Sequence, residues 1–289
     1  MEAQKKVHRG RVVRQLPGCD SGSANMSGKL EGNILVTGSN RGIGLELVKQ
    51  LAETTGEGAH IFASCRAPEG PGAEALRNLS TQSPGKITLI KLDTSDEDSI
   101  SAAVQTVKEQ IGDGGLNLLI NNAAITKPET PAPLSATEKK HMMEVYETNV
   151  AGPFLIAKML LPLLQRAAEI SPEDKGDKMS CRRSAIINIS SIISSIEKCP
   201  ENFNVAPLYA YRASKAALNM VTRCQSEDFK GHNILVTGVH PGWVKTDMGG
   251  QGGALTSTDS VRGILSTLSS LSNKDSGMLL DWEGNKIPW

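Results

Sequence analysis

The chain has 289 residues, enough for one large α/β domain or two small ones with a sizeable buried core. Its 31 basic residues balance its 31 acidic residues, and no apolar run approaches the roughly 20 residues that span a bilayer, so we expect neither nucleic acid nor a membrane as a partner. Five scattered cysteines without metal-ligand spacing indicate reduced thiols, no metal site and a cytoplasmic location.

Residues 1–30 carry six basic residues against two acids and show no periodicity, so we expect a disordered extension before a single domain over residues 31–289. Strand-like and helical segments then alternate, which predicts a parallel sheet covered by helices on both faces. The predicted strands are 33–37, 60–65, 86–92, 116–121, 184–190, 233–240 and 277–282. The predicted helices are 42–54, 73–80, 97–111, 137–149 continuing into 152–168, 211–230 and 257–272. Ser95 and Asp98 predict a capping box at the start of helix 97–111.

The stretch 33–44 has the pattern of a strand, a tight turn and a helix. Its first five residues are apolar and β-branched, as in a strand buried on both faces. Gly38, Gly42 and Gly44 then allow a sharp turn, a diphosphate close to the backbone and tight packing of the next helix. The free amides at the helix start favour an anion. A purely structural turn also fits, because the spacing departs from the common dinucleotide-binding fingerprint.

A second copy of the same six letters, Asn-Ile-Leu-Val-Thr-Gly, occupies residues 233–238 and lacks the glycines that follow the first. Pro241 stands three residues beyond it, where proline removes an amide and opposes a phosphate-binding helix start. We therefore expect another strand of the sheet at this position, and no second nucleotide site.

Tyr211 and Lys215 lie four residues apart in a predicted helix, and therefore on one helical face. A tyrosine with an ordinary pKa of about 10 is a poor acid or base at neutral pH, and a neighbouring cation lowers that pKa. The pair is a candidate for proton transfer. Two such residues can equally be surface neighbours without a chemical role, because position alone does not identify a catalytic group.

Small hydrogen-bonding residues follow two apolar strands of the predicted sheet. Asn121 and Asn122 come after residues 118–120, and Ser190 and Ser191 come after residues 186–189. Residues of this kind often cap helices or satisfy turns. However, the carboxyl ends of parallel strands meet at one edge of an open α/β sheet, where such sheets place their ligands. Their convergence there indicates a binding site.

Together these motifs stand in the order of one known family. They are Thr37-Gly38 with Gly42-Ile43-Gly44, Asp93, Asn121-Asn122-Ala123-Ala124, Asn149, Ser191, Tyr211 with Lys215, and Pro241-Gly242. Over about residues 33–289 the chain resembles the short-chain dehydrogenase/reductases. Segments 209–215, 240–248 and 287–289 are similar to those of the small NADP-dependent carbonyl reductases, the branch that includes sniffer and the C-factor-like proteins.

The resemblance implies one Rossmann-type doubly wound domain with a seven-stranded, mostly parallel sheet. It also implies an NADP(H)-dependent enzyme that reduces a small-molecule aldehyde, ketone or quinone. Tyr211 would donate the proton, Ser191 would hold the carbonyl oxygen, and Lys215 would lower the pKa of Tyr211 while binding the nicotinamide ribose. Asn149 would hold a water that links Lys215 to solvent. A homodimer is one assembly that the resemblance allows.

The same resemblance implies a set of cofactor-binding residues. Besides Tyr211 and Lys215 they are Gly38, Asn40, Arg41, Gly42, Ile43, Gly44, Arg66, Asp93, Asn121, Val244 and Thr246. Among them Asp93 would contact the adenine, Asn121 the ribose side of the cofactor and Thr246 the carboxamide.

The residue after the second strand predicts which nicotinamide cofactor is used. An NAD site places an acid about 20 residues beyond the glycine turn, and that carboxylate repels a 2′-phosphate. Here Arg66 follows the strand, and Arg41 stands inside the turn. Arginine binds phosphate through bidentate hydrogen bonds, so the pair predicts NADP(H), unless both are solvated surface residues.

Ser191 and Tyr211 are separated by more residues than is usual in the family, because of a hydrophilic stretch over 196–208. We expect this stretch to be a loop that covers the substrate pocket or alters a subunit interface. Two other functions stay open: an NADP(H)-binding regulator without catalysis, and a signalling protein with incidental activity. The complete set of four catalytic positions favours an enzyme, since a regulator has no use for a proton donor.

Overall fold

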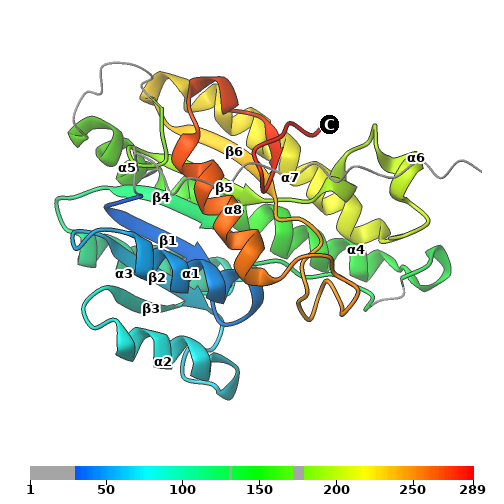
Figure 1. Ribbon diagram of the computed structural model, residues 1–289, viewed down its shortest axis with the longest axis horizontal. Coiled ribbons are helices and arrows are strands. Elements are labelled where there is room, and N and C mark those ends of the chain that lie inside the picture. The colour runs from blue at the N-terminus through cyan, green and yellow to red at the C-terminus, as the bar shows by residue number, and fades with distance from the viewer. Residues whose placement is uncertain (1–29, 130–131, 172–178) are drawn as a thin grey trace, which may run out of the picture.

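The computed structural model describes residues 30–129, 132–171 and 179–289, and its centre is one sheet in the order β3-β2-β1-β4-β5-β6-β7 (Figure 1). The strands are β1 (Asn33–Thr37), β2 (His60–Cys65), β3 (Ile87–Lys91), β4 (Leu116–Asn121), β5 (Ala185–Ile189), β6 (Leu235–His240) and β7 (Leu279–Asp281). Neighbouring strands pair in parallel throughout. The predicted seven-stranded sheet is confirmed, with strand ends within two residues of those expected.

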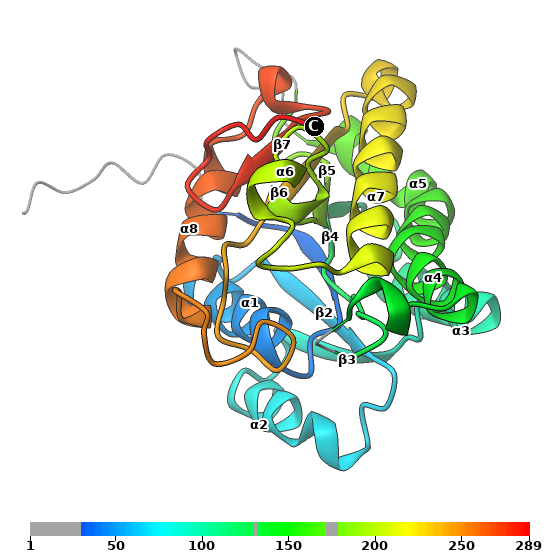
Figure 2. The ribbon, with the colours of Figure 1, turned by 90° about the vertical axis from the view of Figure 1, so that its right-hand side faces the viewer.

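Helices cover both faces of the sheet, as predicted (Figure 2). On one face lie α1 (Gly42–Thr54), α2 (Glu74–Gln82) and α8 (Ser257–Ser270), and on the other lie α3 (Glu97–Ile111), α5 (Gly152–Ile170) and α7 (Tyr209–Asp228). The helix α4 (Lys139–Tyr146) runs through the π-helix η3 (Glu147–Ala151) into α5. Short 3₁₀ helices are η1 (Pro71–Ala73), η2 (Leu134–Ala136), η4 (Ile192–Ser194), η5 (Lys230–His232) and η6 (Asn273–Asp275).

Two apolar layers hold the helices on the sheet. Neighbouring residues of β1 enter different layers: Ile34 packs with α1 and α8, whereas Leu35 packs with α3 and α5. This alternation follows from the period of two in a strand, and it explains why β1 is apolar at each of residues 34–36. Full burial of such a side chain stabilises the fold by about 1.5–3 kcal/mol.

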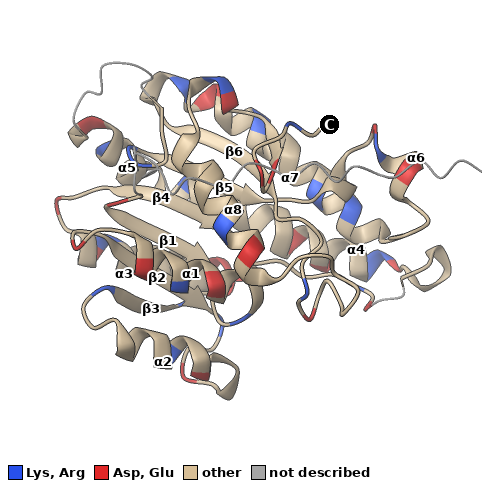
Figure 3. Ribbon diagram, in the orientation of Figure 1, with Lys and Arg blue, Asp and Glu red and all other residues tan. Residues whose placement is uncertain are grey.

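Charged residues are interspersed over the helices in view (Figure 3). Ion pairs such as Arg223–Glu227 at 3.0 Å and Arg262–Asp259 at 2.9 Å join side chains that are about half exposed or more. Exposed pairs of this kind contribute about 0–1 kcal/mol each, because solvent screens them. The stability of the domain therefore comes mainly from its two apolar layers.

Three local predictions are corrected by the structure. Leu30 is only 5% exposed and packs in the layer beside α1, so it belongs to the domain, whereas residues 1–29 of the predicted extension lie outside the described residues. Asp96, and not Ser95, caps α3, because its Oδ1 accepts from the amides of Asp98 and Ser99 at 3.0 and 3.3 Å. The stretch 196–208 is not only a loop, since it contains the short helix α6 (Cys199–Asn202).

One helix among the described residues has the length and composition of a membrane span, although none was expected. The continuous helix Lys139–Ile170 has 32 residues and contains a window of mean hydropathy 1.2, which is long and apolar enough to cross a membrane. Half of that window is buried inside the fold. A core helix meets the same criteria, and α5 packs its apolar side on the sheet and on α3.

Gly115 directly precedes β4 and lies so close to α5 that we expect it to accept no side chain. A Cβ on this glycine would lie 2.2 Å from the backbone nitrogen of Ala167, so the backbone would have to move. Gly115→Ala should lower the free energy of unfolding by about 1–3 kcal/mol in urea denaturation. Gly56→Ala is the matched control, because nothing lies within 4 Å of its added Cβ. Equal losses in both variants would contradict this account.

Candidate active site

The glycine turn lies at the point where the strand order reverses, between β1 and β4. Asn122 Nδ2 donates to the carbonyls of Thr37 and Gly38 at 2.9 and 3.1 Å. Thr37 Oγ1 accepts from the amides of Asn122 and Ala123, both at 3.0 Å. These four hydrogen bonds fix the turn to the neighbouring strand. Sequence reasoning gave Asn122 no role of its own, and its place directly after a buried strand was the only signal.

The turn has the backbone conformation that a phosphate-binding loop needs. Gly38 and Gly42 have φ angles of +67° and +55°, a region that favours glycine. A Cβ on Gly44 would lie 2.1 Å from the carbonyl oxygen of Gly38, so only glycine allows α1 to approach the turn. Arg41 stands at the N-cap of α1 and makes no side-chain cap, which leaves the first amides available to an anion.

Two other residues of the turn have mainly structural contacts. Asn40 Nδ2 donates to the carbonyl of Gly72 at 3.1 Å, and Ile43 is half-buried against the apolar layer of α1. Because their side chains are engaged in this way, a cofactor bound at the turn would contact mainly the backbone of these two residues.

The predicted phosphate-binding arginines differ in their surroundings. Arg66 is exposed and directly follows β2, the strand beside β1. Arg41 Nη1 pairs with Asp247 Oδ2 at 2.9 Å, and both side chains are more than two-thirds exposed. Such a pair is weak in water, so a phosphate can replace the carboxylate at Arg41. Asp93 is half-buried, and its Oδ1 accepts from the Ser95 amide at 3.0 Å.

The segment after β6 faces the glycine turn from the opposite side. A Cβ added to Gly42 would lie 3.4 Å from Thr246 Cγ2, which places Thr246 across from the turn. Thr246 Oγ1 accepts from the amide of Gly249 at 3.0 Å. Val244 is 3% exposed and forms a strand-like bridge with Leu255, so its side chain belongs to the core. Only its backbone remains for the predicted contact with a cofactor.

Asn121 does not present its side chain to the site. It is 2% exposed, and its Nδ2 donates to Asn188 Oδ1 at 2.9 Å in the interior of the sheet. The predicted contact of Asn121 with the ribose would therefore have to come from its backbone. The cause is the period of two in a strand, which turns Asn121 inward and leaves Asn122 to follow the edge.

Tyr211 and Lys215 lie on α7 beside the end of β5. Lys215 is 2% exposed, and its Nζ donates to the carbonyl of Ile189 at 2.7 Å and lies 5.8 Å from the centre of the Tyr211 ring. Burial lowers the pKa of Lys215 to about 7 and raises the pKa of Tyr211 to about 12. The expected lowering of the Tyr211 pKa by Lys215 is not found, because desolvation disfavours the charged form of each group.

Asn149 joins α7 to the segment that follows β4. It lies on the π-helix η3, and its Nδ2 donates to the carbonyl of Ile125 at 2.9 Å and to Ser214 Oγ at 3.1 Å. Its Oδ1 accepts from the Ile125 amide at 2.9 Å. Because these partners occupy the side chain, the predicted water contact would have to involve the backbone. A π-helical turn offsets that backbone from the regular α-helical pattern.

Arg212, beside Tyr211, is a structural anchor that sequence reasoning missed. It is 8% exposed, and its guanidinium donates to the carbonyls of Ala206, Ile193 and Asn202 at 2.7, 3.1 and 2.9 Å. It also lies over the ring of Phe203, 5.6 Å from the centroid. Within the described residues no carboxylate pairs with it. Arg212 thus anchors the segment between Ser191 and Tyr211, which no spacing rule could predict because its partners are backbone carbonyls.

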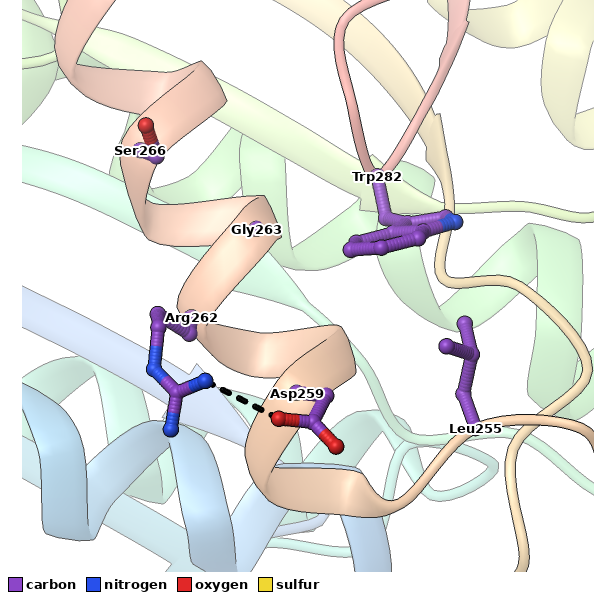
Figure 4. Close-up of a pocket in the computed structure, with 6 residues that line it drawn as sticks. All are labelled: Leu255, Asp259, Arg262, Gly263, Ser266 and Trp282. Carbon is purple, nitrogen blue, oxygen red and sulfur yellow. Dashed lines mark hydrogen bonds and ion pairs between the residues drawn. The ribbon is translucent and has the colours of Figure 1, made fainter. Parts of the chain in front are cut away.

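A surface hollow of about 500 Å³ is lined by α8 on one side and by Trp282 and Leu255 on the other (Figure 4). Asp259 and Arg262 pair across its lower wall at 2.9 Å. It contains none of the residues assigned to catalysis or cofactor binding. The part of the chain that the structure describes also holds no group of three or more His, Cys, Asp or Glu residues that could bind a metal ion.

We expect Lys215 to make the stability of the cofactor-free protein depend on pH. Its pKa falls from 10.5 to about 7 on folding, so between these values the unfolded chain binds more protons and stability rises with pH. Urea denaturation should show a gain of up to about 1.4 kcal/mol per pH unit between pH 7 and 9, relative to Lys215→Met. If the free energy of unfolding depended on pH in the same way in both proteins, the lowered pKa of Lys215 would be contradicted.

Comparisons with known proteins agree with the fold and the motifs. The family model for short chain dehydrogenases matches residues 32–254. The short-chain dehydrogenase anuI of Penicillium roqueforti is 30% identical over 260 residues, which cover 88% of this chain and 95% of that protein.

Two solved carbonyl reductases have the same fold. The NADPH-bound enzyme from chicken fatty liver is 42% identical with a TM-score of 0.84, and the match covers 91% of this chain and 97% of that one. Sniffer of D. melanogaster is 35% identical with a TM-score of 0.81, and the match covers 90% and 100%. The chain therefore belongs to the short-chain dehydrogenase family, in agreement with its motifs.

Proposed function

We propose that this protein is an NADP(H)-dependent reductase that converts an aldehyde, ketone or quinone to an alcohol. The observation that carries the proposal is the contact of Lys215 Nζ with the carbonyl of Ile189, because it brings the Tyr211–Lys215 pair to the strand end where Ser191 stands. The related carbonyl reductase from chicken fatty liver binds NADPH, which supports the same cofactor here.

The residues around the glycine turn fit such a cofactor. The turn offers free amides and a backbone without Cβ atoms at Gly38, Gly42 and Gly44, which suits a diphosphate. Arg66 and Arg41 supply positive charge beyond the ends of β2 and β1, and the acid that would favour NAD is replaced by Arg66. Thr246 would bound the site on its far side.

When bound, NADPH supplies a hydride to the carbonyl carbon of the substrate. Ser191 Oγ accepts from the Ile193 amide at 3.4 Å, which leaves its hydroxyl proton to donate to the carbonyl oxygen. Tyr211 donates its phenol proton to the same oxygen, so no alkoxide has to persist. Lys215, whose pKa is about 7, would stabilise the phenolate in its protonated form, because a cation nearby favours the phenolate.

The raised pKa of Tyr211 is consistent with reduction. With a pKa of about 12 the phenol keeps its proton at neutral pH, so the group is ready to act as an acid. Asn149 supports this arrangement through Ser214, whose Oγ donates to the Tyr211 carbonyl at 2.8 Å. The first turn of α7 is thereby fixed to η3, and Tyr211 with it.

We expect Tyr211→Phe to lower kcat by at least about a hundredfold, because phenylalanine keeps the ring and removes the acid. NADPH binding, followed by quenching of tryptophan fluorescence, should survive. Tyr209→Phe is the matched control: Tyr209 packs edge-on against Phe203 with ring centroids 5.5 Å apart and has Ala213 where Tyr211 has Lys215. An active Tyr211→Phe variant would contradict the role of Tyr211 as proton donor, and a dead Tyr209→Phe variant beside it would show that the motif is misaligned. A wild-type protein that binds NADPH and reduces no carbonyl compound would favour the regulator.

Cofactor choice should depend on the arginines beside the turn. A charge-assisted contact contributes roughly 1.5–3 kcal/mol, so Arg66→Ala or Arg41→Ala should lower kcat/KM for NADPH by about ten- to a hundredfold and leave NADH little affected. Arg262→Ala is the control, because Arg262 is an exposed arginine paired with a carboxylate on α8. Steady-state assays at 340 nm in one buffer give all values. Wild-type preference for NADH, or equal losses with both cofactors, would contradict the assignment.

A further inference from the structure

We propose that Asn219 is a positioning residue, which holds the backbone around Ser191 so that the Ser191 hydroxyl points at the substrate carbonyl. The proposal rests on the function proposed above, because Ser191 acquires its role there. Asn219 stands four residues after Lys215 and is 4% exposed.

One face of α7 is hydrogen-bonded to the end of β5 over about two turns. Lys215 donates to the carbonyl of Ile189, Asn219 contacts Ser190, and Thr222 Oγ1 accepts from Asn188 Nδ2 at 2.8 Å. These α7 residues are buried, and their spacing of four and three residues places them on one side of the helix. Each therefore meets a different residue of the strand end.

The Asn219 amide holds the chain on both sides of Ser191. Its Oδ1 accepts from Ser190 Oγ at 2.6 Å, and its Nδ2 donates to Ser194 Oγ at 2.7 Å. Ser194 Oγ in turn donates to the carbonyl of Ser191. Ser190 and Ser194 are 2% and 3% exposed, so water does not compete for these contacts. A single side chain thus fixes the residue before Ser191 and the carbonyl of Ser191 itself.

The direction of each hydrogen bond follows from the chemistry of the amide. Because Asn219 Nδ2 donates to Ser194 Oγ, the single Ser194 hydroxyl proton is directed to the Ser191 carbonyl. If an acceptor stood there instead, it would compete for the Ser194 proton and leave the Ser191 carbonyl with only the Ser194 amide, at 3.0 Å. Asparagine therefore supplies a hydrogen-bond donor to Ser194 Oγ, which an ionised aspartate of the same shape cannot supply.

Ser191 depends on this support because its own side chain is loosely held. Its hydroxyl oxygen accepts from the Ile193 amide at the long distance of 3.4 Å, and its backbone is extended with φ −155° and ψ 147°. The direction of the hydroxyl is therefore set by the backbone that carries it. A displacement of about 1 Å at a reacting group lowers a rate by about a hundredfold.

The test is a double-mutant cycle between Asn219→Asp and Ser191→Ala. In the wild-type background, Asn219→Asp should lower kcat by about ten- to a hundredfold, while the dissociation constant of NADPH stays unchanged. In the Ser191→Ala background the same substitution should change kcat by less than about twofold, because the hydroxyl that it misdirects is already absent. Ser194→Ala breaks the link at its other end without altering α7, and should give the same coupling if Asn219→Asp fails to fold.

Thr222→Val is the matched control, since Thr222 lies on the same buried face and contacts Asn188 rather than the segment around Ser191. It should lower Tm and show no coupling to Ser191→Ala. Equal losses from Asn219→Asp and from Ser194→Ala in both backgrounds would overturn the positioning role and leave a structural one. A Ser191→Ala variant with wild-type kcat would contradict the proposed function itself, which separates the two failures.

Discussion

The hydrogen bonds between Thr37 and Asn122 are the constraint on which the site depends. Beyond these residues β1 continues into α1 on one face of the sheet, whereas β4 leads to α4 on the other, so the chain divides at this point. The bonds set the separation of the two segments, and Gly44 lets α1 come close to the turn. The amides of α1 therefore point at a fixed place beside the strand ends.

Hydrogen bonds to the main chain also fix the helix α7. Lys215 and Arg212 are both buried, and backbone carbonyls take the place of carboxylates as their partners. A buried polar group destabilises a protein unless it is hydrogen-bonded, so these contacts are required for α7 to pack where it does. They also fix the position of α7 relative to the end of β5 and to the segment between Ser191 and Tyr211. Lys215 and Arg212 are thus held mainly by the main chain rather than by other side chains.

Periodicity and glycine placement were sufficient to predict the sheet, its helices and the edge that carries the motifs. They did not predict the direction in which a side chain points or the partner to which it is hydrogen-bonded. Asn121 and Asn122 are chemically identical neighbours, and only the pleat of β4 shows which one faces the site. Arg212 and Asn219 were missed because their partners come from segments about six to 29 residues away in sequence, and such contacts leave no local pattern. Asp96 displaced Ser95 as a cap because both residue types cap helices well.

The two sides of the site also differ in how their charges would respond to ionic strength. Arg41 and Asp247 meet in water, and mobile ions with a screening length of about 8 Å weaken such a pair in physiological salt. The Arg212 guanidinium is bound by carbonyl dipoles in the interior, where mobile ions do not enter. A higher salt concentration would therefore weaken the Arg41–Asp247 contact beside the glycine turn and leave the segment between Ser191 and Tyr211 unchanged.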